Sequence, residues 1–405
     1  MPHFDKRDFP VFEKYPGLAY LDNSATTQKP VQVLEAAEKY YREENANPLR
    51  GLYGLAVKAT DAYENARTAV KDFIGADSER EIIFTRNATE SLNLIAYSYG
   101  RANIGKGDEV LITISEHHSN MLPWQLLTEE RGAKLKYLKC TETGEYTAEA
   151  LKAALTPRTK IFACAQISNV FGRLNPIKGF AEVCHANGTV IVCDGAQSVP
   201  HIPVNVRELG VDFLAFSGHK MLAPMGIGVL YGREELLEKM PPFLSGGEMI
   251  EYVTLCGATY AELPHKFEAG TVNAGGAVGL HAAIDYIKEL GFAEIERREN
   301  ALTSLAIAEM RRIPHINIIG SDDPDDHHGI VTFTIDDVHP HDIAAIFDES
   351  DVAIRAGHHC AQPLHKFLRV PSTSRASIAF YNDEGDIARF IECLKTIRRR
   401  MGHSE

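Results

Sequence analysis

Lys220 is the residue whose position points most directly to chemistry. It ends the segment Ser217-Gly218-His219-Lys220, which directly follows the apolar run Phe213–Phe216. A lysine held at the end of a strand can form a Schiff base with a carbonyl cofactor, because its neutral amine is a nucleophile. A lone lysine is more often a solvated surface charge. The interpretation therefore depends on the other residues that accompany it.

Asp194 is the second such residue. It ends the apolar run Thr189–Cys193, where a carboxylate is costly unless it is paired. The pyridinium nitrogen of pyridoxal phosphate is a suitable partner, and this pairing makes the cofactor an electron sink. Gln197 follows shortly after and can hydrogen-bond the ring hydroxyl. Taken alone, Asp194 could be only a turn cap, but together with Lys220 it favours a pyridoxal-phosphate site.

A phosphate cradle is predicted at Asn87-Ala88-Thr89-Glu90, between a strand and a helix. The backbone N–H groups there, including that of Ala88, and the hydroxyl of Thr89 can face an anion at the helix N-terminus. Thr89 could instead be an ordinary N-cap. Ser217 and His219 would complete the cradle. His117 follows the next strand and could stack on the cofactor ring, although a lone histidine is more often a structural hydrogen-bonding residue.

The elements that carry these residues alternate between short apolar strands and amphipathic helices. This order predicts an α/β fold with a mainly parallel sheet and helices on both faces. Ligands bind beyond the carboxyl ends of strands in such sheets, and polar clusters follow five of the predicted strands. After about Gly291 the chain has long charged helical stretches and few strands, as in a smaller α+β domain. We predict a large domain at 20–291 and a small domain formed by 1–19 and 292–405.

The composition limits the possible functions. The chain has 405 residues, of which 44% are apolar, so it can bury the cores of two domains. A net charge of −13 provides no global attraction for nucleic acid or an anionic membrane. The seven scattered cysteines form no C-x-x-C pair, which argues against disulfides and an intrinsic metal site. No signal-peptide pattern or long apolar run is present, and we expect a cytoplasmic protein that binds neither membrane nor nucleic acid.

Four segments together resemble a known family. They are Asp194-Gly-Ala-Gln197, Ser217-Gly-His-Lys220, Glu268-Ala-Gly-Thr271 and Arg355-Ala-Gly-His-His-Cys-Ala-Gln-Pro363. The combination resembles the cysteine desulfurases of the class V aminotransferase superfamily, and most closely the SUF-type, group II enzymes, which also include selenocysteine lyases. The resemblance implies the fold type I of pyridoxal-phosphate-dependent transferases, with a seven-stranded sheet in the large domain.

The resemblance also implies roles for the cofactor residues. Lys220 would carry the cofactor and move the substrate's proton, and His117 would stack on the ring and assist that transfer. Asp194 would pair with the pyridinium nitrogen, and Gln197 would hold the phenolic oxygen. Thr271 would reach the phosphate held by a neighbouring subunit, which implies a homodimer.

The substrate residues follow from the same resemblance. Asn169 would lie near the phenolic oxygen and the substrate carboxylate. Arg375 would clamp that carboxylate with its planar fork, which lysine cannot copy. Arg355 and Arg50 would line the same pocket.

Cys360 is the predicted nucleophile. Free cysteines are usually small buried apolar residues, but this one follows Arg355-Ala-Gly-His-His, whose basic groups favour the thiolate. The resemblance implies that Cys360 takes the sulfur of L-cysteine as a persulfide and leaves alanine; L-selenocysteine, with selenium in place of sulfur, is the alternative substrate. The sulfur would then go to an acceptor for iron–sulfur cluster assembly.

His341 is a candidate for contact with that acceptor. It lies in Asp337-Val-His-Pro-His-Asp342, and the stretch resembles SUF enzymes whose acceptor is a small zinc-binding protein. A histidine there would take over a zinc position and free the acceptor's cysteine, since neutral imidazole is a common zinc ligand. An ordinary surface histidine in a turn is the alternative.

Three other functions remain open from the sequence. A selenocysteine lyase would use the same scaffold with a different substrate preference. A pyridoxal-phosphate aminotransferase or epimerase of the same fold would not need the loop that carries Cys360. A non-catalytic scaffold would be expected to lack Lys220 or Cys360, and both are present.

Overall fold

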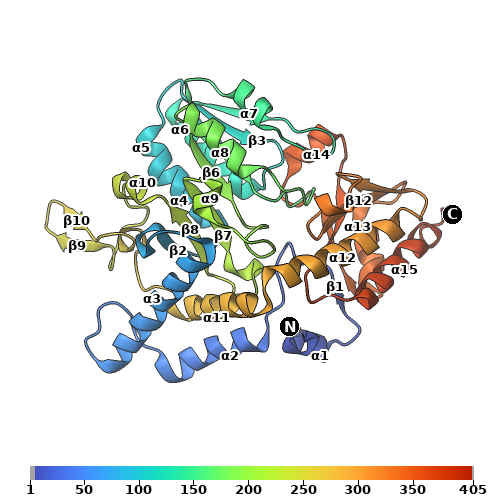
Figure 1. Cartoon of the computed structure of the whole chain (residues 1–405), viewed down its shortest axis with the longest axis horizontal. Helices are drawn as coiled ribbons and strands as arrows, with labels where there is room; N and C mark the ends of the chain where they lie inside the picture. The colour runs from blue at the N-terminus through green and yellow to red at the C-terminus, as the bar shows by residue number, and fades with distance from the viewer. Residues whose placement is uncertain (1–4, 404–405) are drawn as a thin grey trace.

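A seven-stranded sheet forms the centre of the larger part of the molecule (Figure 1). The computed structural model of the protein describes residues 5–403. In order across the sheet, the strands are β2 (Ile82–Thr85), β8 (Gly228–Gly232), β7 (Phe213–Ser217), β6 (Val190–Asp194), β5 (Thr159–Ala165), β3 (Glu109–Thr113) and β4 (Lys134–Leu138). β8 runs antiparallel to both of its neighbours, and the other adjacent pairs are parallel. The predicted mainly parallel α/β sheet is confirmed.

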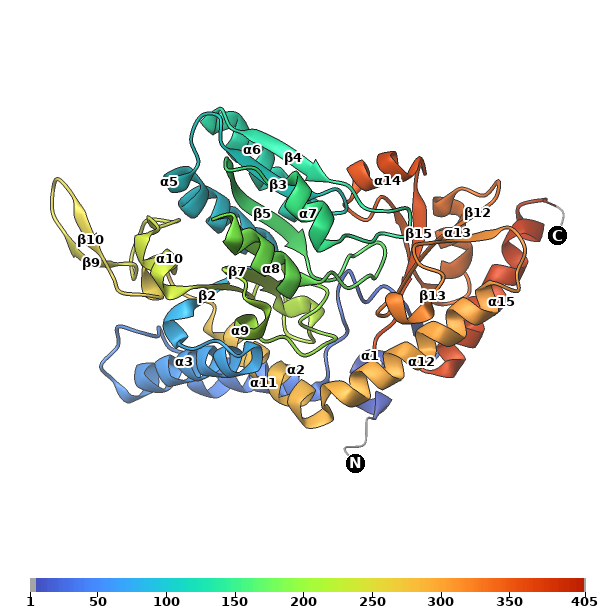
Figure 2. The ribbon, with the colours of Figure 1, turned by 45° about the horizontal axis from the view of Figure 1, so that its top comes forward.

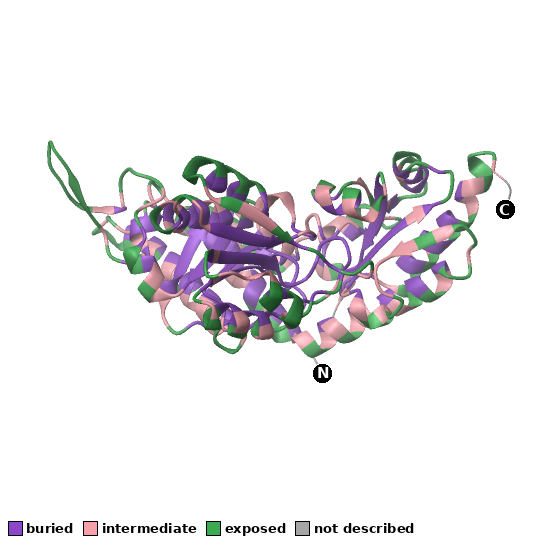
Figure 3. Cartoon of the chain, turned by 90° about the horizontal axis from the view of Figure 1, so that it is seen from above, coloured by how far each residue is buried: buried purple, intermediate pink, exposed green. Residues whose placement is uncertain are grey.

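Alternate residues of the strands enter two separate cores on the two faces of this sheet. In β6, Ile191 and Cys193 belong to one core, while Val192 belongs to the other, because successive side chains of a strand point to opposite faces. Buried strands lie between layers of helices in Figure 3. The helices of the larger part are α2 (Val31–Lys39), α3 (Gly54–Ile74), α4 (Ala88–Leu94), α5 (Arg101–Asn103), α6 (Leu122–Arg131), α7 (Ala148–Ala154), α8 (Ile177–Ala186), α9 (Val206–Leu209), α10 (Glu234–Lys239) and α11 (Ala274–Leu290).

A second, antiparallel sheet organises the smaller part of the molecule. Its strands are, in spatial order, β11 (Ile316–Ile319), β12 (Ile330–Ile335), β15 (Thr373–Ser377) and β14 (Arg355–Gly357). The helices of this part are α12 (Phe292–Met310), α13 (Pro340–Asp348), α14 (Gln362–Leu368) and α15 (Glu384–Arg400). Phe333 of β12 and Phe390 of α15 pack in its core. Figure 2 shows α12 extending from the larger part along this sheet.

Two short strand pairs complete the fold. β1 (Ala19–Tyr20) pairs in parallel with β13 (Val352–Ala353). β9 (Ile250–Val253) and β10 (Ala258–Tyr260) form a hairpin that extends away from the rest of the chain (Figure 2). Most of its residues are exposed, as Figure 3 shows.

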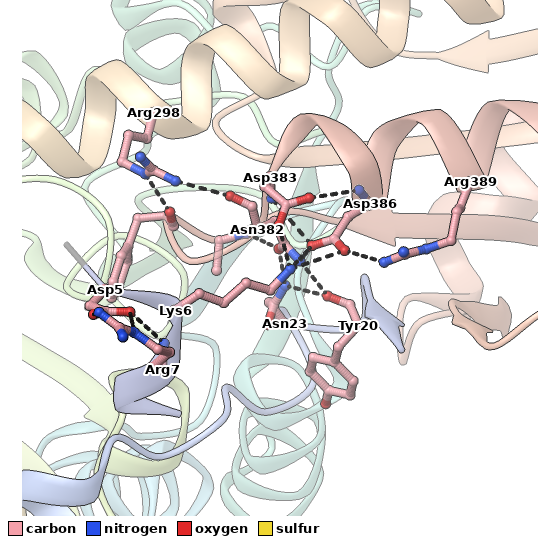
Figure 4. Close-up of polar contacts among 12 residues, drawn as sticks. Asp5, Lys6, Arg7, Tyr20, Asn23, Arg298, Asn382, Asp383, Asp386 and Arg389 are labelled. Atoms are coloured by element: carbon pink, nitrogen blue, oxygen red, sulfur yellow. Dashed lines mark hydrogen bonds and ion pairs between the residues drawn. The ribbon is translucent and has the colours of Figure 1, made fainter. Parts of the chain in front are cut away.

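The N-terminal segment is bound to the start of α15. The Lys6 ammonium lies 2.6 Å from a carboxylate oxygen of Asp383 and 3.0 Å from one of Asp386 (Figure 4). The side-chain amide of Asn382 donates to the backbone oxygen of Tyr20 at 3.0 Å. Helix α1 (Pro10–Lys14) follows. The division of the chain near residues 20 and 292 stays a prediction.

All seven cysteines are free thiols. Between residues 5 and 403, no helix combines the length and the apolar character needed to cross a membrane.

Candidate active site

A cavity of about 210 Å³ lies where the carboxyl ends of the parallel strands face the loop between β14 and α14. It brings together twelve of the predicted site residues. They are Ala88, Thr89, His117, Asn169, Asp194, Gln197, Ser217, His219, Lys220, Arg355, Cys360 and Arg375.

Strand register places the central residues of this cavity side by side. Asp194, the last residue of β6, is opposite Ala165 of β5 and Ala215 of β7. Ser217 ends β7, and the chain then turns through a short 3₁₀ helix, η6 (Gly218–Lys220). Parallel strands thus present their terminal polar residues at one edge, as the order of the strands predicts.

Lys220 and Asp194 have complementary electrostatic environments. Burial lowers the pKa of Lys220 to about 8, Asp194 opposes this shift, and Arg375 and Arg355 add to it. Burial raises the pKa of Asp194, while the N–H of Ala196, which donates to its carboxylate at 2.9 Å, and the charge of Lys220 lower it. A lysine with a lowered pKa is neutral in a larger fraction of molecules, and is therefore a better nucleophile near neutral pH.

The loop before α4, where the phosphate cradle is predicted, lines one side of the cavity. The N–H of Ala88 donates to the hydroxyl of Ser217 at 2.9 Å, which links this loop to the end of β7. The Asn87 side chain caps the helix by accepting from the N–H of Glu90. Gly228 of β8 permits this approach, because a Cβ there would lie 2.4 Å from the Cα of Asn87. The helix continues through a π-helical segment, η4 (Ile95–Gly100), into α5.

His117 is held in a defined orientation. Its Nδ1 accepts from the N–H of Ser119 at 3.1 Å, and the Ser119 hydroxyl lies 2.7 Å from that of Thr89. Burial, followed by the charge of Lys220, lowers the pKa of His117 to about 3. The imidazole is therefore neutral, and its flat ring adjoins the cavity that contains Lys220.

Arg375 is a buried cation that lines the same cavity. Its Nη1 donates to the backbone oxygen of Asn169 at 2.9 Å, and its Nη2 lies 3.4 Å from a carboxylate oxygen of Asp22. Arg355 lies 3.4 Å from the other oxygen of Asp22. Burial lowers the pKa of Arg375 to about 10, and Asp22 opposes this shift. The buried Nε of Arg375 has no hydrogen-bond partner in the described part of the chain, so one donor of the guanidinium group is unpaired.

The loop that carries Cys360 (residues 358–361, between β14 and α14), called the thiol loop below, is tightly constrained. His359 and Cys360 have φ angles of 50° and 56°, in the left-handed region that residues other than glycine rarely adopt. The side-chain amide of Asn169 donates to the His359 oxygen at 2.7 Å, and the N–H of His118 donates to the Cys360 oxygen at 2.7 Å. Loops of the larger part therefore hold two consecutive carbonyl groups of the thiol loop, and the Cys360 side chain is exposed at the cavity.

Three predicted residues lie outside this cavity. Arg50 is half exposed and pairs with Glu248 at 2.7 Å. Thr271 is exposed in a separate depression beside Arg86. His341 is exposed in the first turn of α13. A single chain does not bring these three to the site, and their roles stay predictions.

Four residues at or next to the cavity were not singled out from the sequence. Ser119 and Asp22 orient predicted residues, and His359 lines the cavity wall. Glu116 accepts a 2.9 Å hydrogen bond from the N–H of Ala165, a residue that lines the cavity, and burial raises the pKa of Glu116 to about 8. It accepts hydrogen bonds from the hydroxyl of Thr113 and the side chain of Asn120. The sequence signal that could have identified Glu116 was its position directly before His117, after a buried strand.

The fold and this arrangement define a member of an established class. The family "Aminotransferase class-V" matches residues 19–390, and the chain belongs to that family. Several curated relatives are named "Probable cysteine desulfurase". That of Halalkalibacterium halodurans is 48% identical over 404 residues, covering 99% of each chain. That of Staphylococcus epidermidis is 48% identical over 393 residues, covering 96% of this chain and 95% of the relative.

Solved structures of cysteine desulfurases have the same fold as this chain. A cysteine desulfurase from Thermococcus onnurineus superposes with a TM-score of 0.94 at 38% identity, covering 99% of this chain and 100% of that one. The cysteine desulfurase CsdA of Escherichia coli superposes with a TM-score of 0.91 at 35% identity, covering 98% of this chain and 99% of that one. The predicted fold and the predicted membership of the class V aminotransferase family, among cysteine desulfurases, are confirmed.

Proposed function

We propose that this protein is a pyridoxal-phosphate-dependent cysteine desulfurase that converts L-cysteine to L-alanine and retains the sulfur on Cys360. The observation that carries the proposal is that Cys360, Lys220 and Arg375 line one cavity. The similarity over nearly the whole length to proteins named cysteine desulfurases supports it.

The residues of the cavity fit pyridoxal phosphate. The Gln197 amide donates to the Ser24 oxygen at 3.0 Å, and its buried Oε1, which has no partner among the described residues, could accept from a ring hydroxyl. Asp194 is a buried carboxylate suited to a pyridinium nitrogen, and Ala88, Thr89, Ser217 and His219 would hold the phosphate. When bound, this cofactor supplies an electron sink for bonds at the substrate's α-carbon.

Residues of the chain itself would bind the substrate and transfer its proton. The amine of Lys220 would hold the cofactor and then carry the proton taken from the α-carbon. Neutral His117 would cover the ring and assist this transfer. Arg375, with Arg355 beside it, would bind the substrate carboxylate, because guanidinium groups pair with carboxylates in a fork geometry. Asn169 would fix both Arg375 and the thiol loop, through the two hydrogen bonds described above.

Sulfur transfer would occur at Cys360. Its thiolate would attack the substrate sulfur, forming an S–S bond while the substrate's C–S bond breaks and its electron pair remains with the carbon skeleton. Protonation of that carbon gives alanine, and the sulfur remains as a persulfide. The left-handed backbone at His359 and Cys360 supports this role, since strained residues of this kind gather at functional sites.

A homodimer would complete the site. Thr271 lies outside the cavity of its own chain, as expected if it serves the phosphate held by a neighbouring subunit. Arg50 stays a proposed further substrate residue; in the single chain it pairs with Glu248 at 2.7 Å, outside the cavity.

The sulfur acceptor would be a small zinc-binding protein of the SUF system, acting in the cytoplasm in iron–sulfur cluster assembly. The support is that His341 is exposed and that the short thiol loop is fixed at two carbonyl groups. Such a loop cannot carry the persulfide far, so the acceptor's thiol must enter the site.

The test is incubation of the purified protein, loaded with pyridoxal phosphate, with L-cysteine, while alanine and sulfide are measured with and without a thiol reductant. Equal yields of alanine and sulfide with the reductant are expected. Formation of an amino-acid product other than alanine would contradict the proposal.

A further inference from the structure

A chain of hydrogen bonds links the thiol loop to β15 behind the cavity. His365 Nδ1 lies 3.1 Å from the backbone oxygen of Ala361, and His365 Nε2 lies 3.0 Å from the hydroxyl of Thr373. The same hydroxyl lies 2.9 Å from Nε2 of His359, the residue before Cys360. His359, His365 and Thr373 are all buried.

The direction of each bond in this chain can be worked out. A carbonyl only accepts, so His365 Nδ1 carries a proton. Burial lowers the pKa of His365, so the ring is neutral and its Nε2 is an acceptor. Thr373 must therefore donate its single proton to His365. The hydroxyl also lies 3.5 Å from the Gly357 oxygen, but that is the longer contact.

The tautomer of His359 follows from this direction. Because the Thr373 proton is already used, its oxygen accepts from His359, whose Nε2 must carry the hydrogen. Burial, with Arg375 as the next cause, lowers the pKa of His359 to about 2, so its ring is neutral. The Nδ1 of His359 is therefore a bare acceptor.

This Nδ1 has no hydrogen-bond partner among residues 5–403, although His359 is buried and is one of the residues that line the cavity. A buried acceptor without a partner is costly and uncommon. The nearby charged groups, Arg375 and Arg355, are committed to Asp22 and, as proposed above, to the substrate carboxylate. A donor on the bound substrate would satisfy the nitrogen.

We propose that His359 is a specificity residue whose Nδ1 accepts a hydrogen bond from the thiol of bound L-cysteine, and that Thr373 is the positioning residue that fixes its tautomer. The inference rests on the proposed function. Cysteine has two donor groups, its amine and its thiol. The amine must approach the cofactor end of the cavity at Lys220, whereas the sulfur must approach Cys360, the neighbour of His359 in the chain.

The bond has a chemical consequence. A neutral thiol accepts attack by the Cys360 thiolate, whereas a substrate thiolate would repel it. An acceptor at the substrate sulfur therefore selects the protonated form. A selenol is more acidic than a thiol and is ionised at neutral pH, so selenocysteine has no proton to donate. His359 should contribute to turnover of cysteine and not to turnover of selenocysteine.

The test is Thr373→Val in the enzyme loaded with cofactor, because Thr373 is buried behind His359 and lines no part of the cavity. The substitution keeps the β-branched shape and removes the hydroxyl. We expect kcat/KM for L-cysteine to fall roughly three- to tenfold, as for loss of one neutral hydrogen bond. The value for L-selenocysteine should stay within about twofold of the wild type, and Thr373→Ser should restore turnover of cysteine.

Thr303→Val is the control, since it also removes a buried threonine hydroxyl, one that donates to the Glu299 oxygen at 2.7 Å in α12. It should affect neither substrate. Equal losses for both substrates in Thr373→Val would show a purely structural role and overturn the proposal, as would no loss for cysteine. Failure of the wild type to make alanine would instead reject the proposed function.

A second measurement does not depend on turnover. The ¹⁵N NMR signals of labelled histidine, assigned with His359→Asn, should show a protonated Nε2 and a bare Nδ1 in the wild type. The Thr373→Val protein should lose this single tautomer. A proton on Nδ1 of His359 in the wild type would also overturn the proposal.

Discussion

The backbone oxygen of Cys360 accepts a 2.7 Å hydrogen bond from the N–H of His118. His118 adjoins His117, which faces the cavity from the larger part of the molecule, whereas Cys360 belongs to the loop between β14 and α14. The proposed nucleophile and the residue proposed to cover the cofactor ring are thus joined through the backbone. Neither can shift without disturbing the other.

Lys220→Ala should abolish both cofactor attachment and alanine formation. No other lysine lines the cavity among the described residues, and the amine also serves proton transfer, so turnover should fall by roughly a thousandfold or more. The visible absorption of lysine-bound cofactor and the rate of alanine formation measure the effect. Lys152→Ala, at an exposed position of α7, is the control and should behave as the wild type. Normal turnover of Lys220→Ala would refute the assignment.

Cys360→Ser should separate substrate binding from sulfur transfer. Cysteine should still change the cofactor spectrum, because Lys220, Asp194 and Arg375 remain. Alanine formation should fall by about a hundredfold or more, since a serine hydroxyl is a much poorer nucleophile than a thiolate. Cys256→Ser is a matched control, because Cys256 is also exposed. Turnover of cysteine at wild-type rates in Cys360→Ser would exclude the persulfide mechanism.

Arg375→Lys should weaken substrate binding more than it slows chemistry. Lysine keeps the charge but cannot donate to the Asn169 oxygen and a carboxylate in one plane. The KM for cysteine should rise roughly 10- to 100-fold, the range expected for loss of a charged hydrogen bond. Steady-state kinetics of this variant and of Arg297→Lys, on the exposed face of α12, test this. An unchanged KM in Arg375→Lys would place the carboxylate elsewhere.

Loading of the cofactor should depend on pH through Lys220. The neutral amine reacts, and its fraction grows as the pH rises through the pKa, which lies at about 8. The rate at which the cofactor-free protein recovers its visible absorption should therefore rise with pH, with a midpoint near 8. In Asp194→Asn the midpoint should move to lower pH, because Asp194 raises the pKa of Lys220. A midpoint near that of an ordinary lysine would contradict the desolvation of this amine.

His341→Ala should remove stimulation by the zinc-binding acceptor and leave basal turnover intact. His341 is exposed in the first turn of α13 and lies outside the cavity, so slow, reductant-driven alanine formation should continue at the wild-type rate. His281→Ala, in α11, is the control. Alanine formation is measured with and without the acceptor. Equal stimulation of His341→Ala and the wild type would make His341 an ordinary surface residue.

The residue order alone was sufficient to predict the central part of the site. Asp194, Ser217 and Lys220 each come at or directly after the end of an apolar strand, and parallel strands bring such ends to one edge. The phosphate cradle in the loop before α4 was predicted in the same way, from its position between a strand and a helix. These residues depend on hydrogen bonding between neighbouring strands, which the alternation of strands and helices already specifies.

The packing of segments that are distant in the chain decided the remaining contacts of the site. Asp22 pairs with Arg375 only because the segment after β1 lies beside β15. The hydrogen bonds of Thr373 with His359 and His365 form only because the thiol loop folds onto that strand. Such contacts join residues far apart in the chain or on different elements, and no local pattern encodes their distance or direction. For the same reason, the sequence could place Arg50 near the other arginines, whereas the folded chain pairs it with Glu248 outside the cavity. Local order thus determines which groups reach the edge of the sheet, and long-range packing determines which of them touch.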